Sequence, residues 1–75
     1  MDINDISKLI RYHRKYSGMT QEELANLAGV GKTVIFDIEQ GKETVQMRTL
    51  WLICKALNIN INFSSPLMEK YYASM

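Results

Sequence analysis

Apolar residues recur at helical spacing from the start of the chain. They comprise Ile3, Ile6, Leu9 and Ile10, with His13 on the same face. The positions between them are basic: Lys8, Arg11, Arg14 and Lys15. This pattern predicts an amphipathic first helix that Gly18 ends. Its N-cap candidates are Asp2, Asn4 and Asp5.

Two shorter helices are predicted next, on either side of a tight turn. Thr20 and Glu23 have the spacing of a capping box, and the helix that they open runs to about Ala28. Gly29-Val30-Gly31 then breaks the chain. A third helix is predicted over residues 32–40, before Gly41. Its inward positions are Ile35 and Ile38.

The hydrophobic period changes at residue 58. Before it, a fourth helix is predicted over residues 47–57, with apolar positions Met47, Leu50, Trp51, Ile53, Cys54 and Leu57. From residue 58 to 63, asparagines alternate with apolar residues, which is the pattern of a strand. Ser65 and Pro66 end the strand, as a cap and a first helical position. Residues 67–72 form either one or two helical turns or a loose tail.

These elements predict one mainly α-helical domain over residues 1–75. It has a helical core over residues 3–57, a short strand over 58–64 and a tail over 65–75. A chain of 75 residues buries only about 60% of its unfolded surface and is marginal alone. Its one cysteine excludes an internal disulfide, and Cys54 with His13 cannot complete a four-ligand zinc site. Oligomerisation is the remaining means of stabilisation.

Candidate chemistry is sparse. The sequence has no Ser/His/Asp set, metal-ligand cluster or phosphate-binding loop, so we expect no enzyme activity, no metal and no cofactor. It lacks a signal-peptide pattern and an apolar run of about 20 residues, so we expect a cytoplasmic protein without membrane contact. A net charge of +1 does not by itself indicate a nucleic-acid partner. Such a function must rest on where the charges lie.

Residues 18–41 carry a specific motif. Its elements are Thr20-Gln21, Glu23-Leu24-Ala25, Gly29-Val30, Ile35, and Ile38-Glu39 followed by Gly41. In this combination the segment resembles the helix-turn-helix of the Xre, or Cro/cI-type, repressor family. The resemblance implies a lambda-repressor-like domain of four to five helices. Such a domain presents the N-terminal part of its third helix to the major groove.

The second half of the chain is similar to HipB-type antitoxins, through Leu50-Trp51 and Lys55-Ala56-Leu57-Asn58. This similarity implies a homodimer whose C-terminal strands pair, with two recognition helices about 34 Å apart on a palindromic DNA operator. It also implies an autoregulating repressor that restrains a HipA-like kinase toxin. Two alternatives stay open. One is a phage-type or restriction-modification regulator without a toxin partner, and the other is a protein-interaction module on the same fold.

The resemblance places the DNA contacts on defined positions. The residues expected to read bases are Lys32, Thr33, Phe36 and Asp37. Lys32 suits guanine O6 and N7, Phe36 suits a thymine methyl, and Asp37 suits cytosine N4. The residues expected to bind phosphate are Thr20, Gln21, Lys42 and Arg48. A solvated helix face is the alternative for the base-reading set.

The dimer interface is predicted at the strand. Its residues are Leu52, Ile59, Ile61 and Phe63. Leu52 breaks the helical pattern and would be exposed in a monomer, and beside an unpaired strand edge it indicates a covered surface. We expect the apolar face of the strand to lie against the helical cores.

Three features keep two interpretations each. The basic face of the first helix, with Lys8, Arg11 and Lys15, either contacts DNA or is solvated. Arg14 either belongs with that face or pairs with Glu39. In the tail, the four-residue pairs Leu67–Tyr71 and Met68–Tyr72 form an apolar face. That face either folds back on its own domain or binds a partner.

Overall fold

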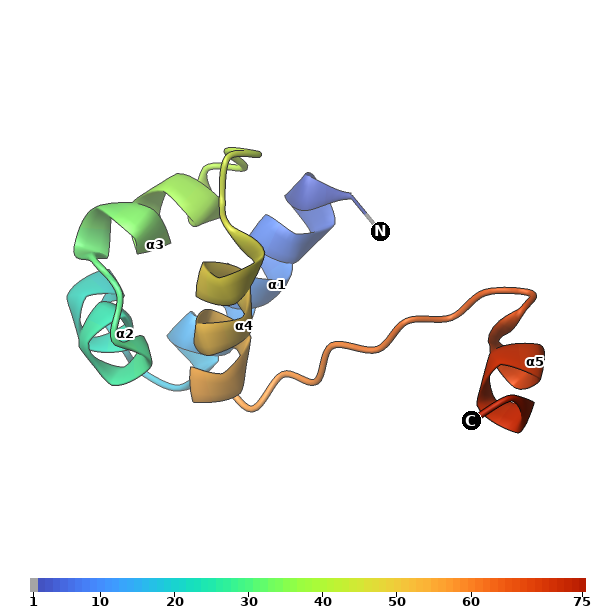
Figure 1. The fold of residues 1–75 in the computed structure, drawn as a ribbon. Coiled ribbons are helices and arrows are strands. Elements are labelled where there is room, and N and C mark those ends of the chain that lie inside the picture. Colours follow the sequence, from blue (N-terminus) through green and yellow to red (C-terminus); the bar gives the residue numbers. More distant parts are fainter. Residues whose placement is uncertain (1) are drawn as a thin grey trace.

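The computed structural model describes residues 2–75, and Figure 1 shows two unequal parts. The helices are α1 (Ile3–Tyr16), α2 (Gln21–Ala28), α3 (Lys32–Glu39), α4 (Met47–Ala56) and α5 (Met68–Ala73). Helices α1–α4 pack together as a body. An extended segment, residues 59–65, leaves the body after α4 and carries α5 away from it. We call this segment the arm.

Local signals set the ends of the first helices. Asp2 caps α1 in a capping box with Asp5, each side chain accepting the other's backbone N–H at 3.1 Å. Thr20 and Glu23 form the box that opens α2, at 3.0 and 2.9 Å. Gly29 ends α2 with a φ of +75°, a left-handed conformation that glycine adopts without the Cβ clash of other residues. The predicted bounds of these helices are therefore confirmed to within one or two residues.

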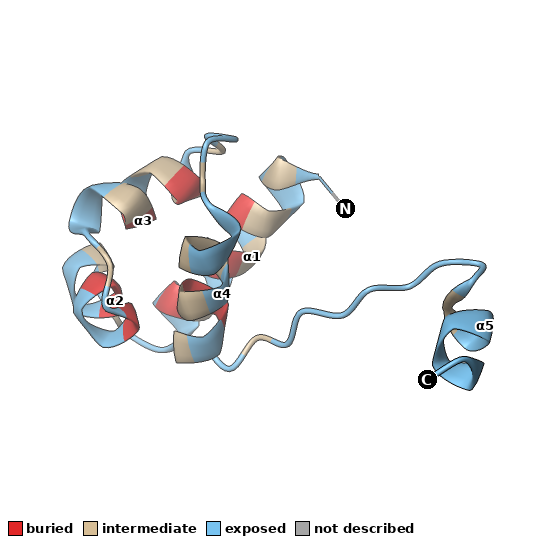
Figure 2. Cartoon of the chain, viewed as in Figure 1, coloured by how far each residue is buried: buried red, intermediate tan, exposed pale blue. Residues whose placement is uncertain are grey.

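The core of the body is apolar and draws on all four helices. Its fully buried side chains are Ile10, Leu24, Ile35, Ile38 and Ile53, and smaller residues such as Ala25 and Ala28 fill the crossing of α2 with its neighbours. Burying each large aliphatic side chain stabilises the fold by roughly 1.5–3 kcal/mol. Figure 2 shows the buried residues concentrated within α1–α4.

A buried hydroxyl joins the start of α1 to the end of α3. The Ser7 Oγ lies within hydrogen-bonding distance of the carbonyl oxygens of Ile3 and Ile38. Beside it, Gly41 has a φ of +86°, and a Cβ at this position would come within 3.0 Å of the Asn4 Oδ1. The left-handed backbone at residue 41 favours glycine, and the Asn4 side chain would have to move for any larger residue.

The turn after α4 directs the arm. Asn58 has a φ of +59°, and the Ile59 N–H donates to the Cys54 carbonyl at 2.8 Å. Ile59 packs against the core, whereas Ile61 and Phe63 are exposed, Phe63 by 71%. No β-strand forms within residues 2–75. The strand expected over residues 58–64 pairs only with a second chain, so both the strand and the pairing stay predictions.

Two details of the C-terminal half differ from expectation. Leu52 was expected to be exposed in a single chain, but it is half-buried. Pro66 is not a first helical position. It lies in a turn, and the Ser65 Oγ accepts the Leu67 N–H one residue before α5 begins.

Helix α5 stands apart from the body, and its residues are exposed except for the half-buried Met68. The tail therefore does not fold back on its own body in this structure. None of the helices in residues 2–75 is long and apolar enough to span a bilayer.

Candidate nucleic-acid interface

The outward face of α3 carries the residues predicted to read bases. Lys32, Thr33 and Phe36 are exposed, and Asp37 is partly exposed. Ile35 and Ile38 on the opposite face are buried. Burial of these two residues fixes the rotation of α3 about its axis, so the opposite face of the helix, with Lys32 and Thr33, points outward. Gly31 caps α3 without a side-chain hydrogen bond, which leaves first-turn N–H groups available beside Lys32 and Thr33.

Phe36 is the largest apolar group on this face, and its exposed fraction is 49%. Exposed phenylalanine occurs on many proteins, so exposure alone indicates little. Its place one turn after Lys32 and Thr33 is more informative, because a major-groove helix reads bases with successive turns of one face. A thymine methyl would cover the ring there.

Asp37 is paired within the chain. Lys42 Nζ lies 3.4 Å from Asp37 Oδ1, across the end of α3. The two residues also line a hollow between α3 and the following loop, with Val34, Thr44, Val45, Gln46 and Thr49 among its other residues. A predicted base-reading acid and a predicted phosphate-binding cation are therefore coupled. Each would have to exchange its partner on contact with DNA.

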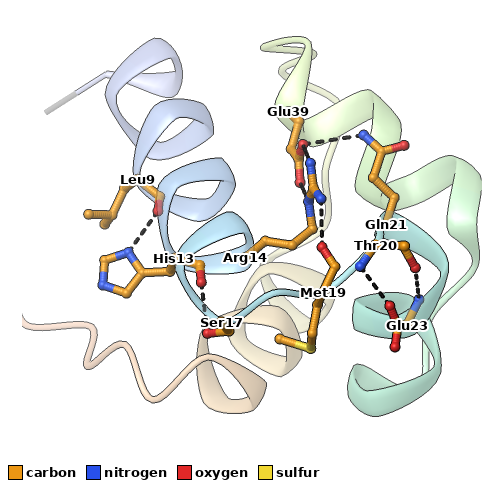
Figure 3. A network of polar contacts seen from close by, with 9 residues as sticks. All are labelled: Leu9, His13, Arg14, Ser17, Met19, Thr20, Gln21, Glu23 and Glu39. Atoms are coloured by element: carbon orange, nitrogen blue, oxygen red, sulfur yellow. Dashed lines mark hydrogen bonds and ion pairs between the residues drawn. The ribbon is translucent and has the colours of Figure 1, made fainter.

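A polar network fixes α1 to the C-terminal end of α3, as Figure 3 shows. Arg14 donates to the Glu39 carboxylate from Nε at 2.7 Å and from Nη2 at 2.9 Å, and from Nη1 to the Met19 carbonyl at 2.8 Å. The two side chains are nearly buried. Hydrogen bonding by Glu39 raises the pKa of Arg14 above its ordinary value, against the opposing effect of burial. The pairing of Arg14 with Glu39 is thus confirmed, and it takes Arg14 out of the basic face of α1.

The start of α2 joins the same network. Gln21 Nε2 donates to Glu39 Oε1 at 3.2 Å, so Glu39 accepts from two helices. The neighbouring Thr20 hydroxyl accepts the Glu23 N–H and keeps its own proton for another acceptor. These contacts hold the first turn of α2 beside the end of α3. Phosphate binding by Thr20 and Gln21 is compatible with this placement and stays a prediction.

Known proteins are similar to this chain over the segment that contains α2, α3 and α4. The model of a family described as Helix-turn-helix matches residues 10–63, which span α2, α3 and α4. The chain belongs to this Xre-type helix-turn-helix family. An uncharacterised HTH-type transcriptional regulator of Sinorhizobium fredii is 39% identical over 83% of this chain and 82% of its own length.

A control protein and a restriction-modification controller protein are also similar to the chain. The control protein C.SmaI of Serratia marcescens is 34% identical over 81% of this chain and 74% of its own. The solved structure of a point mutant of the restriction-modification controller protein C.Esp1396I superposes with a TM-score of 0.69 at 33% identity. It covers 77% of this chain and 75% of that one. The body therefore has the fold of an Xre-type helix-turn-helix domain.

Within this helix-turn-helix domain, Arg48 lies apart from the other predicted phosphate ligands. It is the second residue of α4 and lines a different hollow, formed with Met47, Trp51, Lys55 and residues 58–63. Lys42 lines the hollow beside α3 instead. The structure thus couples Lys42 to the recognition helix and places Arg48 next to the arm.

The outer face of α1 holds a feature that sequence reasoning missed. Lys8, Arg11 and Lys15 are exposed as a helical face requires. Tyr12 and Tyr16 are exposed among them, with ring centroids 6.1 Å apart in a stacked arrangement. Their four-residue spacing is the signal that could have revealed this pair. The Asp37–Lys42 contact had no such signal, because it crosses the end of a helix.

Proposed function

We propose that this chain is a sequence-specific DNA-binding transcriptional regulator that acts as a homodimer on a palindromic operator. The observation that carries the proposal is the outward N-terminal face of α3, with Lys32 and Thr33 exposed on a helix held by the Arg14–Glu39 pair. Membership of the helix-turn-helix family and similarity to HTH-type regulators support it.

Binding is tested on a site selected from random double-stranded DNA, with unselected DNA for comparison. Lys32→Ala is expected to cost about 1–3 kcal/mol on the selected site and to relax preference at one base pair. Lys42→Ala is expected to weaken both DNAs alike and to make the salt dependence shallower. Lys70→Ala in α5 is the matched control, and its binding should equal that of the parent. Equal losses on both DNAs for Lys32→Ala would remove it from the base-reading set.

Dimerisation through the arm is the second part of the proposal. The exposed Ile61 and Phe63 and the extended backbone support it. Ile61→Pro removes a ladder donor and is expected to give monomers in sedimentation equilibrium. If a chain truncated at Asn58 still dimerises, the interface lies instead on α4, at Leu52 and Trp51.

The narrower biological role rests on partners. Similarity to the restriction-modification controller protein C.Esp1396I is compatible with a regulator of that kind, which stays a hypothesis. A HipA-like kinase partner, expected from the HipB resemblance, stays a hypothesis. Co-expression with the product of the neighbouring gene tests it, because an antitoxin would co-purify with a kinase and suppress its toxicity. A chain that binds a protein but no selected DNA would instead be an interaction module.

A further inference from the structure

Helix α5 presents apolar side chains that its own body does not cover. Leu67 is 64% exposed and Tyr71 is 56% exposed, and Tyr72 and Met75 are exposed as well. A six-residue helix is too short to be stable in water without tertiary packing. Its amphipathic surface therefore requires a cover that lies outside this arrangement of one chain.

The arm keeps α5 out of reach of its own body. Within the described chain, the backbone N–H groups of residues 60–65 have no backbone acceptor. An extended chain rises about 3.3 Å per residue, so seven residues span about 23 Å. The molecule is accordingly 43 Å long and only about 20 Å across. The arm thus carries both an unpaired backbone edge and an uncovered helix.

The body offers a matching hollow at the base of the arm. Its residues include Met47, Arg48, Trp51 and Lys55 of α4, together with residues 58–63. Trp51 is 51% exposed, and Lys55 Nζ lies 4.9 Å from the centroid of its ring. The hollow therefore combines an apolar floor with two cations. Glu69 of α5 is the only acidic residue after Glu43, so its carboxylate can pair with a cation of the hollow, while the neighbouring Lys70 leaves the helix without net charge.

Two-fold symmetry brings these two surfaces together. When two arms pair antiparallel about their midpoint at Asn62, residue 65 of one arm lies opposite residue 59 of the other. The chain that continues from residue 65 then reaches the C-terminal end of the other subunit's α4, and the hollow runs from there along α4 to Met47. Each copy supplies one helix and one hollow, so the contact is closed and self-complementary.

We propose that two copies of this chain exchange their α5 helices. Helix α5 of each subunit packs in the hollow between α4 and the arm of the other, with its Leu67–Tyr71 face toward Trp51 and Met47. The exchange rests on the proposed dimer and extends it, because it assigns the tail to the partner subunit. It also explains why a tail that does not fold back is nevertheless rich in Tyr and Met, which are enriched in interface cores.

Sedimentation equilibrium of the full chain tests the energetic part. Tyr71→Ser is expected to raise the dimer dissociation constant at least about tenfold, which corresponds to about 1.4 kcal/mol. Tyr16→Ser, the same change at an exposed tyrosine of α1, is the matched control and should leave the constant unchanged. An unchanged constant for Tyr71→Ser overturns the exchange and leaves the dimer standing. A parent chain that stays monomeric at every concentration overturns both.

Isotope-filtered NMR on mixed dimers tests the geometry. One subunit is labelled with ¹³C and the other is unlabelled, so that only contacts between subunits are detected. Exchange predicts contacts from the Tyr71 and Tyr72 rings of one subunit to Met47 and Trp51 of the other. Contacts of these rings within their own subunit only would show fold-back and overturn the proposal. Contacts that appear only on adding another protein would assign α5 to that protein instead.

Discussion

The body and the C-terminal segment of this chain use similar residues in opposite ways. In the body, Leu24 and Ile35 are fully buried, whereas in the segment after Asn58, Leu67 and Phe63 are mostly exposed. The number of apolar residues therefore does not explain why the body has a buried core and the C-terminal segment has none. The body closes on itself because its helices supply apolar faces to one another, while the arm separates α5 from those faces and leaves it beside only Ile61 and Phe63 of its own chain.

Polar contacts follow the same division. In the body, Glu39 accepts hydrogen bonds from Arg14 and Gln21 and so connects three helices. In the tail, the Ser65 and Ser74 hydroxyls bond only to backbone within three residues. The body is thus held by contacts distant in sequence, and the tail by local ones. Matched substitutions in the two parts, measured on protein dilute enough to be monomeric, are expected to differ accordingly.

The largest effect is expected at the buried ion pair. Glu39→Ala leaves the Arg14 guanidinium nearly buried without its counter-charge, and we expect a loss of about 3–5 kcal/mol in the free energy of unfolding. Glu69→Ala in α5 is expected to change it by less than about 0.5 kcal/mol, as for an ordinary surface site. Urea unfolding followed by circular dichroism measures both. A small effect at Glu39 would show that the pair is dispensable to the body.

Leucine truncation compares the two parts directly. Leu24→Ala opens a cavity in the core and is expected to cost about 2–5 kcal/mol. Leu67→Ala, the same change on α5, is expected to leave the unfolding of the monomer unchanged. Thermal or urea unfolding distinguishes the two. A similar cost at both sites would mean that α5 packs on its own body in solution.

Helix caps give a smaller contrast. Thr20→Ala removes the side chain that accepts the Glu23 N–H and is expected to cost about 0.5–2 kcal/mol. Ser65→Ala removes the acceptor for the Leu67 N–H, and it should loosen α5 without changing the unfolding of the body. Hydrogen exchange resolves the two effects, because Thr20→Ala should speed exchange in the body, most of all in α2, and Ser65→Ala should speed it only in α5. Faster exchange in α2 for Ser65→Ala would contradict the separation.

The smallest effect is expected in acid. Hydrogen bonding from the Thr20 backbone N–H, with a contribution from its side chain, lowers the pKa of Glu23. A carboxyl group with a pKa lower in the folded state stabilises the fold above its unfolded pKa of about 4.3, and this stabilisation is lost as the pH falls through the folded value. Glu23→Gln should therefore flatten the acid side of the stability profile, and Glu69→Gln should not. An unchanged profile for Glu23→Gln would remove the capping box as its cause.

Sequence reasoning reached the helices because their signals are local. The Thr20–Glu23 box and the left-handed Gly29 each act within a few residues, so spacing alone predicts them. The Arg14–Glu39 pair was reached as one of two alternatives, with the help of a family resemblance. The outward face of α3 followed from the same resemblance together with the inward spacing of Ile35 and Ile38.

What sequence reasoning missed depends on contacts made across the fold. The Ser7 hydroxyl meets a carbonyl 31 residues away, and the Asn4 side chain lies beside Gly41, 37 positions further along the chain. The half-buried position of Leu52 does not follow from its helical phase alone. The surroundings of Ile61 and Phe63 depend on a second chain, so no pattern within one chain determines them.

The arm also changes how the molecule scatters X-rays in solution. A compact chain of this length has a radius of gyration of about 11 Å, whereas this chain has 14.1 Å. The excess arises because a small mass, α5, lies far from the centre. Small-angle X-ray scattering of dilute protein is therefore sensitive to the position of one six-residue helix relative to the body. If α5 closed onto its own body, the longest interatomic vectors would disappear from the distance distribution while the scattering of the body stayed the same.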